Sequence, residues 1–125
     1  MISALYIDDC NPLLGIVSRF LTCNGDMTVE TAMSLQDGGE MVRNHRYGVV
    51  IMDYNLKDSK GLEFFRQLRG EGITIPVIFF TLDACREIED GLLEPGRVWF
   101  VRKCSGTVSG VGELDRIIRQ EICSP

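Results

Sequence analysis

Acidic residues follow two apolar runs of the sequence, at the points where polar residues resume. Asp8 and Asp9 come directly after Ala4–Ile7, and Asp53 closes the run Val49–Met52. An apolar run without polar alternation is typical of a strand that is buried on both faces, where an unpaired carboxylate is costly. Asp53 therefore needs a cation or another physical reason for its place.

Two further polar residues follow apolar runs in the second half of the chain. Thr81 follows Pro76–Phe80, and Lys103 lies just beyond Val98–Val101. If all four runs are parallel strands, their carboxyl ends meet at one edge of the sheet. Three carboxylates at that edge suit a hard divalent cation, best Mg²⁺. A lysine and a hydroxyl facing this cation suit a phosphoryl group, and this makes Asp53 a candidate nucleophile that forms an acyl phosphate.

The elements that must position these residues alternate along the chain. Apolar runs predict five strands, at Ala4–Ile7, Met27–Ala32, Val49–Asp53, Pro76–Phe80 and Val98–Val101. Apolar residues at helical spacing predict five helices, from Asn11 to about Asn24, Ser34 to Arg43, Leu62 to about Gly70, Ala84 to Leu93 and Leu114 to Ile122. The last helix is expected to follow a stretch of small residues, Ser105–Gly112.

This alternation predicts an α/β domain with a single five-stranded parallel sheet, doubly wound as (βα)5, with right-handed crossovers and helices on both faces. A chain of 125 residues fits one domain. The second helix is the weakest element of this prediction, because Gly38 and Gly39 each cost about 1 kcal/mol relative to alanine.

Composition excludes several classes of function. Lys and Arg number 13 against 18 Asp and Glu, a net charge of −5 without a basic cluster, so no direct nucleic-acid partner is expected. The 5 cysteines form no C-x-x-C pair and follow no signal peptide. No apolar run approaches the ~20 residues of a membrane span. We therefore expect a cytoplasmic domain that does not bind membranes.

Taken together, these residues resemble the response-regulator receiver domain of two-component signalling, over essentially the whole chain. The resemblance implies a flavodoxin-like strand order of 2-1-3-4-5. The separations agree with that family: 44 residues from Asp9 to Asp53, 28 to Thr81 and 22 to Lys103. The resemblance implies that Asp8 and Asp9 are the metal-binding acidic pair and that Asp53 is the phosphoacceptor. It also implies that Thr81 is the switch hydroxyl, Phe100 the switch aromatic residue and Lys103 the phosphate-binding lysine.

The resemblance extends to residues around this set. Asn55 stands where the family lends a backbone carbonyl to the metal, and Asp8 is expected to bind that metal through water. Leu82 and Asp83 stand at positions that modulate the site: bulk at Leu82 is expected to slow phosphorylation, and polar residues at Asn55 and Asp83 indicate a signal that decays. Cys104 replaces the proline that usually follows the lysine.

The function implied is a phosphorylatable switch. A histidine kinase would donate a phosphoryl group to Asp53 in a reaction that needs Mg²⁺ or Mn²⁺, and Thr81 and Phe100 would then change the affinity for a downstream partner. The partner surface would comprise helix 84–93, strand 98–101 and the last helix, and a homodimer is one arrangement the family allows. No enzyme activity is expected beyond self-catalysed phosphoryl transfer and slow autodephosphorylation. The chain is expected to stand alone or to be the N-terminal domain of a larger signalling protein, and Cys104 favours a sensor kinase.

Three alternatives remain open. A docking module that works without phosphorylation is one, because Leu82 and Cys104 depart from the family pattern. A Mg²⁺-dependent phosphohydrolase with an aspartyl-phosphate intermediate is less favoured, since Asp8-Asp9-Cys10-Asn11 lacks the D-x-D-x-T pattern. A flavodoxin-like nucleotide binder is disfavoured because its first loop needs a phosphate cradle of small residues, not two acids.

Overall fold

Five parallel strands form a single sheet at the centre of the molecule. A computed structural model describes residues 2–9, 11–53, 61–81, 98–102 and 107–122. The sheet has the order β2-β1-β3-β4-β5, as the family resemblance implies, and every neighbouring pair is parallel. Its strands are β1 (Ile2–Ile7), β2 (Met27–Ala32), β3 (Val49–Asp53), β4 (Val77–Thr81) and β5 (Val98–Arg102).

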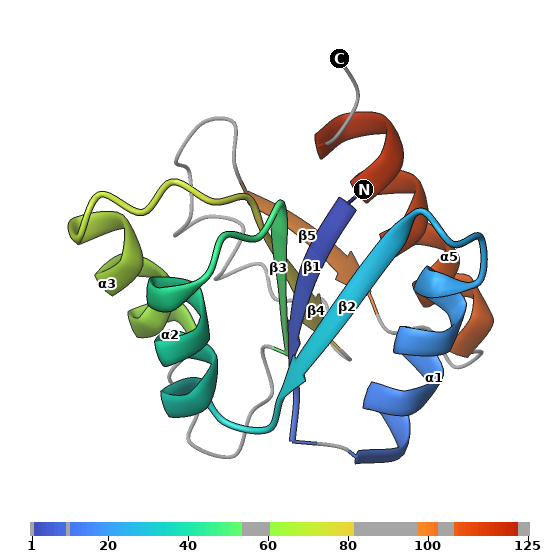
Figure 1. Cartoon of the computed structure of the whole chain (residues 1–125), viewed down its shortest axis with the longest axis horizontal. Coiled ribbons are helices and arrows are strands. Elements are labelled where there is room, and N and C mark those ends of the chain that lie inside the picture. The colour runs from blue at the N-terminus through green and yellow to red at the C-terminus, as the bar shows by residue number, and fades with distance from the viewer. Residues whose placement is uncertain (1, 10, 54–60, 82–97, 103–106, 123–125) are drawn as a thin grey trace.

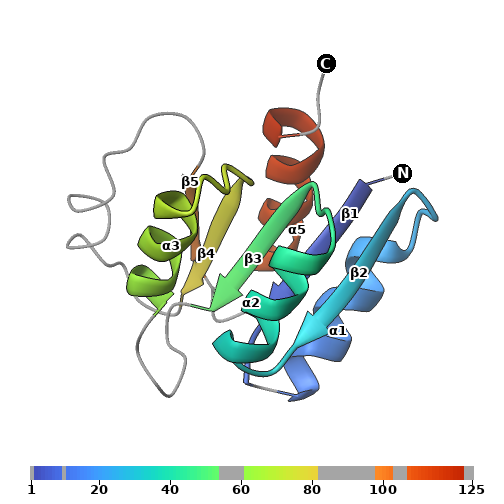
Figure 2. The same cartoon turned by 60° about the vertical axis from the view of Figure 1, so that its left-hand side comes forward.

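Helices cover both faces of this sheet. Figures 1 and 2 show α1 and α5 together on one face and α2 and α3 on the other. Because consecutive parallel strands need a crossover, each described helix runs antiparallel to the strand before it and returns the chain to the same starting edge. The helices are α1 (Asn11–Thr22), α2 (Leu35–Asn44), α3 (Gly61–Gly70) and α5 (Thr107–Ile117), and α5 continues into a π-helical turn, η1 (Ile118–Ile122).

The strands bury both of their faces, which explains their continuous apolar runs. All five residues of β3 are buried, including the terminal Asp53. One apolar core fills the space under α2 and α3 and contains Ile7, Met52 and Phe79. A second core lies under α1 and α5 and contains Tyr6 and Phe80. Neighbouring residues of one strand thus belong to opposite cores, as strand pleating requires.

Two glycines allow α2 to approach the sheet closely. Ser34 caps the helix by accepting a hydrogen bond from the Asp37 amide at 3.1 Å. A Cβ atom on Gly38 would lie 2.4 Å from Ile7 Cδ1, and one on Gly39 would lie 3.0 Å from Phe64 Cε2. The glycines therefore reduce intrinsic helix propensity but permit contacts with β1 and α3 that larger residues would block.

A Gly38→Ala substitution is expected to destabilise the protein. The added methyl group overlaps the fully buried Ile7 side chain, and overpacking of this kind costs about 1–3 kcal/mol, more than the ~1 kcal/mol gained in helix propensity. Urea unfolding followed by circular dichroism measures the difference. Gly15→Ala is the matched control: Gly15 is an exposed residue of α1 with no atom within 4 Å of the new Cβ, so it should gain up to about 1 kcal/mol. Equal gains in both variants would contradict this account.

Several element boundaries differ from the prediction by one or two residues, and the start of the last helix differs by more; β4, for example, spans Val77–Thr81 where Pro76–Phe80 is predicted. The strand predicted from Ala4 begins at Ile2, and the one predicted to end at Val101 includes Arg102. The last helix begins at Thr107, within the small-residue stretch that was predicted to precede it. It forms there because its apolar face buries Val111 and Leu114 against the sheet. Helix 84–93 lies outside the described residues.

The C-terminal helix is tied to the start of β2 by ion pairs. Arg119 of η1 donates to Asp115 at 2.9 Å and to Asp26 through Nη2 at 2.9 Å. The Arg119 hydrogen bonds hold the pKa of the Asp26 carboxyl below its usual range.

None of the described helices has the length and apolar character that crossing a membrane requires.

Candidate functional site

Three acidic residues meet at the carboxyl edge of the sheet. Asp8 and Asp9 directly follow β1, and Asp53 is the last residue of β3. These two strands are hydrogen-bonded neighbours, with Ile7 opposite Met52. The Asp8 amide also donates to the Ala32 carbonyl at 3.0 Å, which holds the start of this loop beside the end of β2.

The acidic cluster formed by Asp8, Asp9 and Asp53 is compact. Each residue offers a carboxylate oxygen that lies within 4.8 Å of those of the other two. Asp8 is 0% exposed and Asp53 is 4% exposed, whereas Asp9 is partly exposed. Unit charges at about 4 Å repel one another by roughly 4 kcal/mol at an effective dielectric constant of 20. Such an arrangement strongly favours a bound positive charge.

The donor set of the acidic cluster fits a hard divalent cation. All three ligand atoms are carboxylate oxygens, the type that Mg²⁺ and Ca²⁺ prefer. Two oxygens bound to one Mg²⁺ lie at most about 4.2 Å apart, so a spacing within 4.8 Å needs only a small closure, or one carboxylate that binds through water. Partial exposure of Asp9 gives a cation access from solvent.

Tyr6, which was not predicted to be a site residue, contacts the acidic cluster. Tyr6 donates a hydrogen bond from its hydroxyl to Asp8 Oδ2 at 2.6 Å, and both residues are fully buried. The signal was present in the sequence: residues two apart on a strand point to the same face, so a tyrosine two positions before an acid can reach it. A tyrosine hydroxyl in a core also needs a polar partner.

Of the other predicted site residues, two lie in described strands and the rest lie outside the described part of the chain. Thr81 is the last residue of β4 and lies opposite Arg102, and Phe100 lies in β5 opposite Phe79. Four further predicted residues and the residue after the lysine fall outside the described part of the chain: Asn55, Leu82, Asp83, Lys103 and Cys104.

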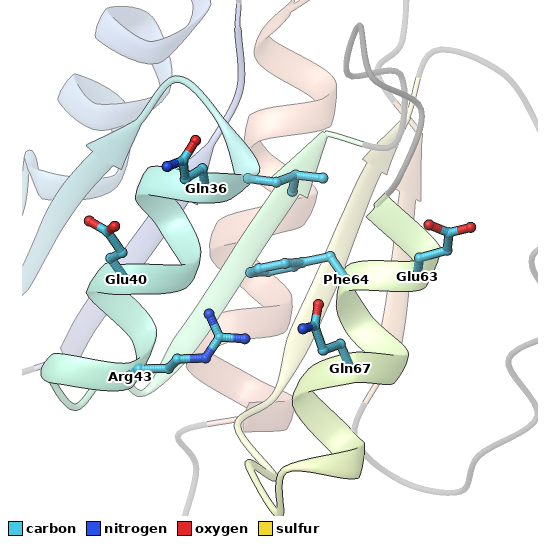
Figure 3. A pocket seen from close by; sticks show the side chains of 7 residues that line it. Gln36, Glu40, Arg43, Glu63, Phe64 and Gln67 are labelled. Carbon is cyan, nitrogen blue, oxygen red and sulfur yellow. The ribbon is translucent and has the colours of Figure 1, made fainter.

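A separate groove lies between α2 and α3 (Figure 3). It has a volume of about 350 Å³, and Leu35 and Phe64 line it together with polar residues of both helices. Arg43 at its edge is held by Glu71 through a bidentate ion pair, with distances of 2.9 and 2.7 Å. None of the acids of the acidic cluster lines this groove, so it is a different feature from the candidate site.

Comparison with protein families identifies one match over most of the chain. The family described as the response regulator receiver domain matches residues 4–111. A protein-glutamate methylesterase/protein-glutamine glutaminase of Natronomonas pharaonis is 32% identical over 110 residues. That alignment covers 86% of this chain but 31% of the relative, so the chain spans about a third of that protein's length.

Solved structures share the fold. The response regulator domain of Thermotoga maritima CheB superposes with a TM-score of 0.81 at 22% identity, covering 100% of this chain and 98% of that domain. The non-phosphorylated HemR receiver domain of Leptospira biflexa gives a TM-score of 0.80 at 19% identity, with coverage of 100% and 98%. At these identities the likeness concerns the fold alone.

Proposed function

This chain belongs to the response regulator receiver domain family, and on that premise we propose that it accepts a phosphoryl group from a histidine kinase on Asp53. One observation carries the proposal: the carboxylates of Asp8, Asp9 and Asp53 gather within 4.8 Å at the carboxyl edge of the sheet. An acid at the end of a buried strand, beside two others, is poorly explained by fold stability alone.

The acidic cluster would hold Mg²⁺, or Mn²⁺ in its place. Asp9 and Asp53 would bind it directly and Asp8 through water, with the Asn55 carbonyl as a further ligand by family resemblance; the grouping of the three acids supports this set. When bound, the cation supplies positive charge that neutralises the phosphoryl oxygens and the Asp53 carboxylate. The chain's own contribution is to hold these carboxylates together and to shield two of them from water.

Asp53 would act as the nucleophile. One of its carboxylate oxygens forms the new O–P bond while the P–N bond of the donor phosphohistidine breaks, and the imidazole leaves with the electron pair of that bond. The product is an aspartyl phosphate. By family resemblance, Lys103 would pair with one phosphoryl oxygen, and the Thr81 hydroxyl would donate a hydrogen bond to another.

The result of phosphorylation would be a change in partner binding. Thr81 and Phe100 lie on neighbouring strands, one at the end of β4 and the other in β5. A hydroxyl drawn toward the phosphoryl group and an aromatic residue that follows it would shift an existing equilibrium at the surface of helix 84–93, β5 and α5. The chain then works in the cytoplasm as a switch more than as an enzyme, and residues 1–125 form one receiver domain.

Intact-mass measurement tests this proposal directly. The protein is incubated with acetyl phosphate or phosphoramidate, with Mg²⁺ and with EDTA in its place. A single phosphoryl adduct that requires Mg²⁺ is expected. No adduct under any condition would instead favour a docking module that works without phosphorylation, and sustained turnover of a phosphomonoester would favour a phosphohydrolase.

A further inference from the structure

The buried contact between Tyr6 and Asp8 carries an inference about cation binding. We propose that the Tyr6 hydroxyl is a positioning group that holds the Asp8 carboxylate in the orientation a divalent cation needs. This role rests on the proposed function, because it assigns to one residue part of the cation affinity of the acidic cluster. The hydroxyl donates to Asp8 Oδ2 at 2.6 Å, a short and strong hydrogen bond to a charged acceptor.

The surroundings of Tyr6 fix its hydroxyl in space. Its backbone lies in the middle of the sheet, opposite Thr31 of β2 and Ile51 of β3. Its ring packs edge-on against Phe80, with centroids 6.4 Å apart and planes at 65°. The side chain is 0% exposed within the core under α1 and α5. The phenol therefore has little freedom to follow a moving carboxylate and instead constrains it.

The hydrogen bond leaves Asp8 able to bind a cation. A carboxylate has about four lone-pair directions, and the phenol occupies one of them on Oδ2. With this hydrogen bond in place, an oxygen of Asp8 still lies within 4.8 Å of oxygens of Asp9 and Asp53, as a shared cation requires. Holding a ligand in place before the cation arrives reduces the conformational freedom that binding would otherwise remove.

A purely structural role for the same hydrogen bond predicts a different result. If Tyr6 only satisfied a buried acid, its loss would destabilise the cation-free protein and leave cation affinity unchanged or tighter, because the freed oxygen gains a lone pair for the metal. If Tyr6 positions Asp8, its loss weakens cation affinity. The direction of the change in Kd therefore separates the two roles.

Tyr6→Phe removes the hydroxyl and keeps the ring. We expect it to raise the Kd for Mn²⁺ about 10-fold, the lower end of the usual effect of partners that orient metal ligands. Free Mn²⁺ is measured by electron paramagnetic resonance during titration of the unphosphorylated protein. The rate of adduct formation should fall at low Mg²⁺ and approach that of the unsubstituted chain at saturating Mg²⁺. An unchanged or lower Kd for Mn²⁺ would overturn the role.

Tyr47→Phe is the matched control. Tyr47 is also buried, at 8% exposure, and its hydroxyl also donates to a carboxylate, that of Glu30. Glu30 lies on β2 and is not part of the acidic cluster. The control variant should lose a comparable hydrogen bond and keep its Kd for Mn²⁺. A similar loss of affinity in both variants would show a general effect of destabilisation and would also overturn the role.

A fluorine label tests the contact if Tyr6→Phe does not fold. The chain has 3 tyrosines, so a Tyr47→Phe, Tyr54→Phe variant grown with 3-fluorotyrosine carries the label at Tyr6 alone. Titration with Mg²⁺ should shift the Tyr6 fluorine resonance with the Kd of cation binding, and a resonance that does not move would overturn the role. Failure of the unsubstituted chain to bind any divalent cation would instead contradict the proposed function itself.

Discussion

An Asp53→Asn variant should acquire no phosphoryl adduct under conditions in which the unsubstituted chain acquires one. The amide has nearly the same shape as the carboxylate, so β3 and the buried environment of residue 53 are preserved. The amide nitrogen and oxygen are poor nucleophiles and carry no charge, so the O–P bond cannot form at a useful rate. Intact mass after incubation with acetyl phosphate and Mg²⁺ measures the difference.

Asp37→Asn serves as the control for this experiment. Asp37 is an exposed residue in the first turn of α2, outside the acidic cluster, and its substitution removes the same charge. This variant should form the adduct at close to the normal rate. An adduct that persists in Asp53→Asn would mean that another residue accepts the phosphoryl group, and would remove Asp53 from the proposed mechanism.

Adding Mg²⁺ should stabilise the folded chain by an amount that mass action sets. A ligand that binds only the native state at 100 times its Kd raises the free energy of unfolding by about 2.7 kcal/mol. The acidic cluster exists only when β1 and β3 are paired, so the unfolded chain offers no comparable site. Urea unfolding with Mg²⁺ and with EDTA tests this, with the single tryptophan, the partly buried Trp99, as a fluorescent probe.

Asp9→Asn should lose most of this stabilisation. If the substitution raises the Kd 100-fold, the same Mg²⁺ concentration contributes only about 0.4 kcal/mol. Asp37→Asn should keep the full increase, since its carboxylate is not part of the acidic cluster. An equal increase in all three proteins would indicate a general salt effect in place of a bound cation.

The sequence was sufficient to predict the fold because the parallel strands are buried on both faces. Val49–Met52 shows no alternation, and the structure places all four residues in the interior of the sheet. The start of the last helix was predicted wrongly because the glycines and serines between 105 and 112 interrupt the helical spacing of its apolar residues. There the burial of Val111 and Leu114 outweighs weak local propensity.

The acidic cluster was predictable for a related reason: its members end neighbouring strands, and parallel strands end at one edge. Asp8, Asp9 and Asp53 do meet there. The contact from Tyr6 was missed because an aromatic residue within an apolar run is usually read as core. Tyr6 is core, but the pleat also directs its hydroxyl toward the acid two residues later. The pleat makes this contact possible, but the side-chain conformations that bring the two oxygens to 2.6 Å are set by packing in the folded core.

The close contacts of Gly38 and Gly39 also bear on the order in which the chain folds. A helix of 10 residues such as α2 is marginal by itself, and two interior glycines weaken it further. It gains stability only when Ile7 and Phe64 are in place to pack against. We therefore expect α2 to form late, with φ-values near zero along the helix, after a nucleus that includes β1 and β3. The two glycines that let α2 pack closely against the sheet would therefore make it one of the last helices to form.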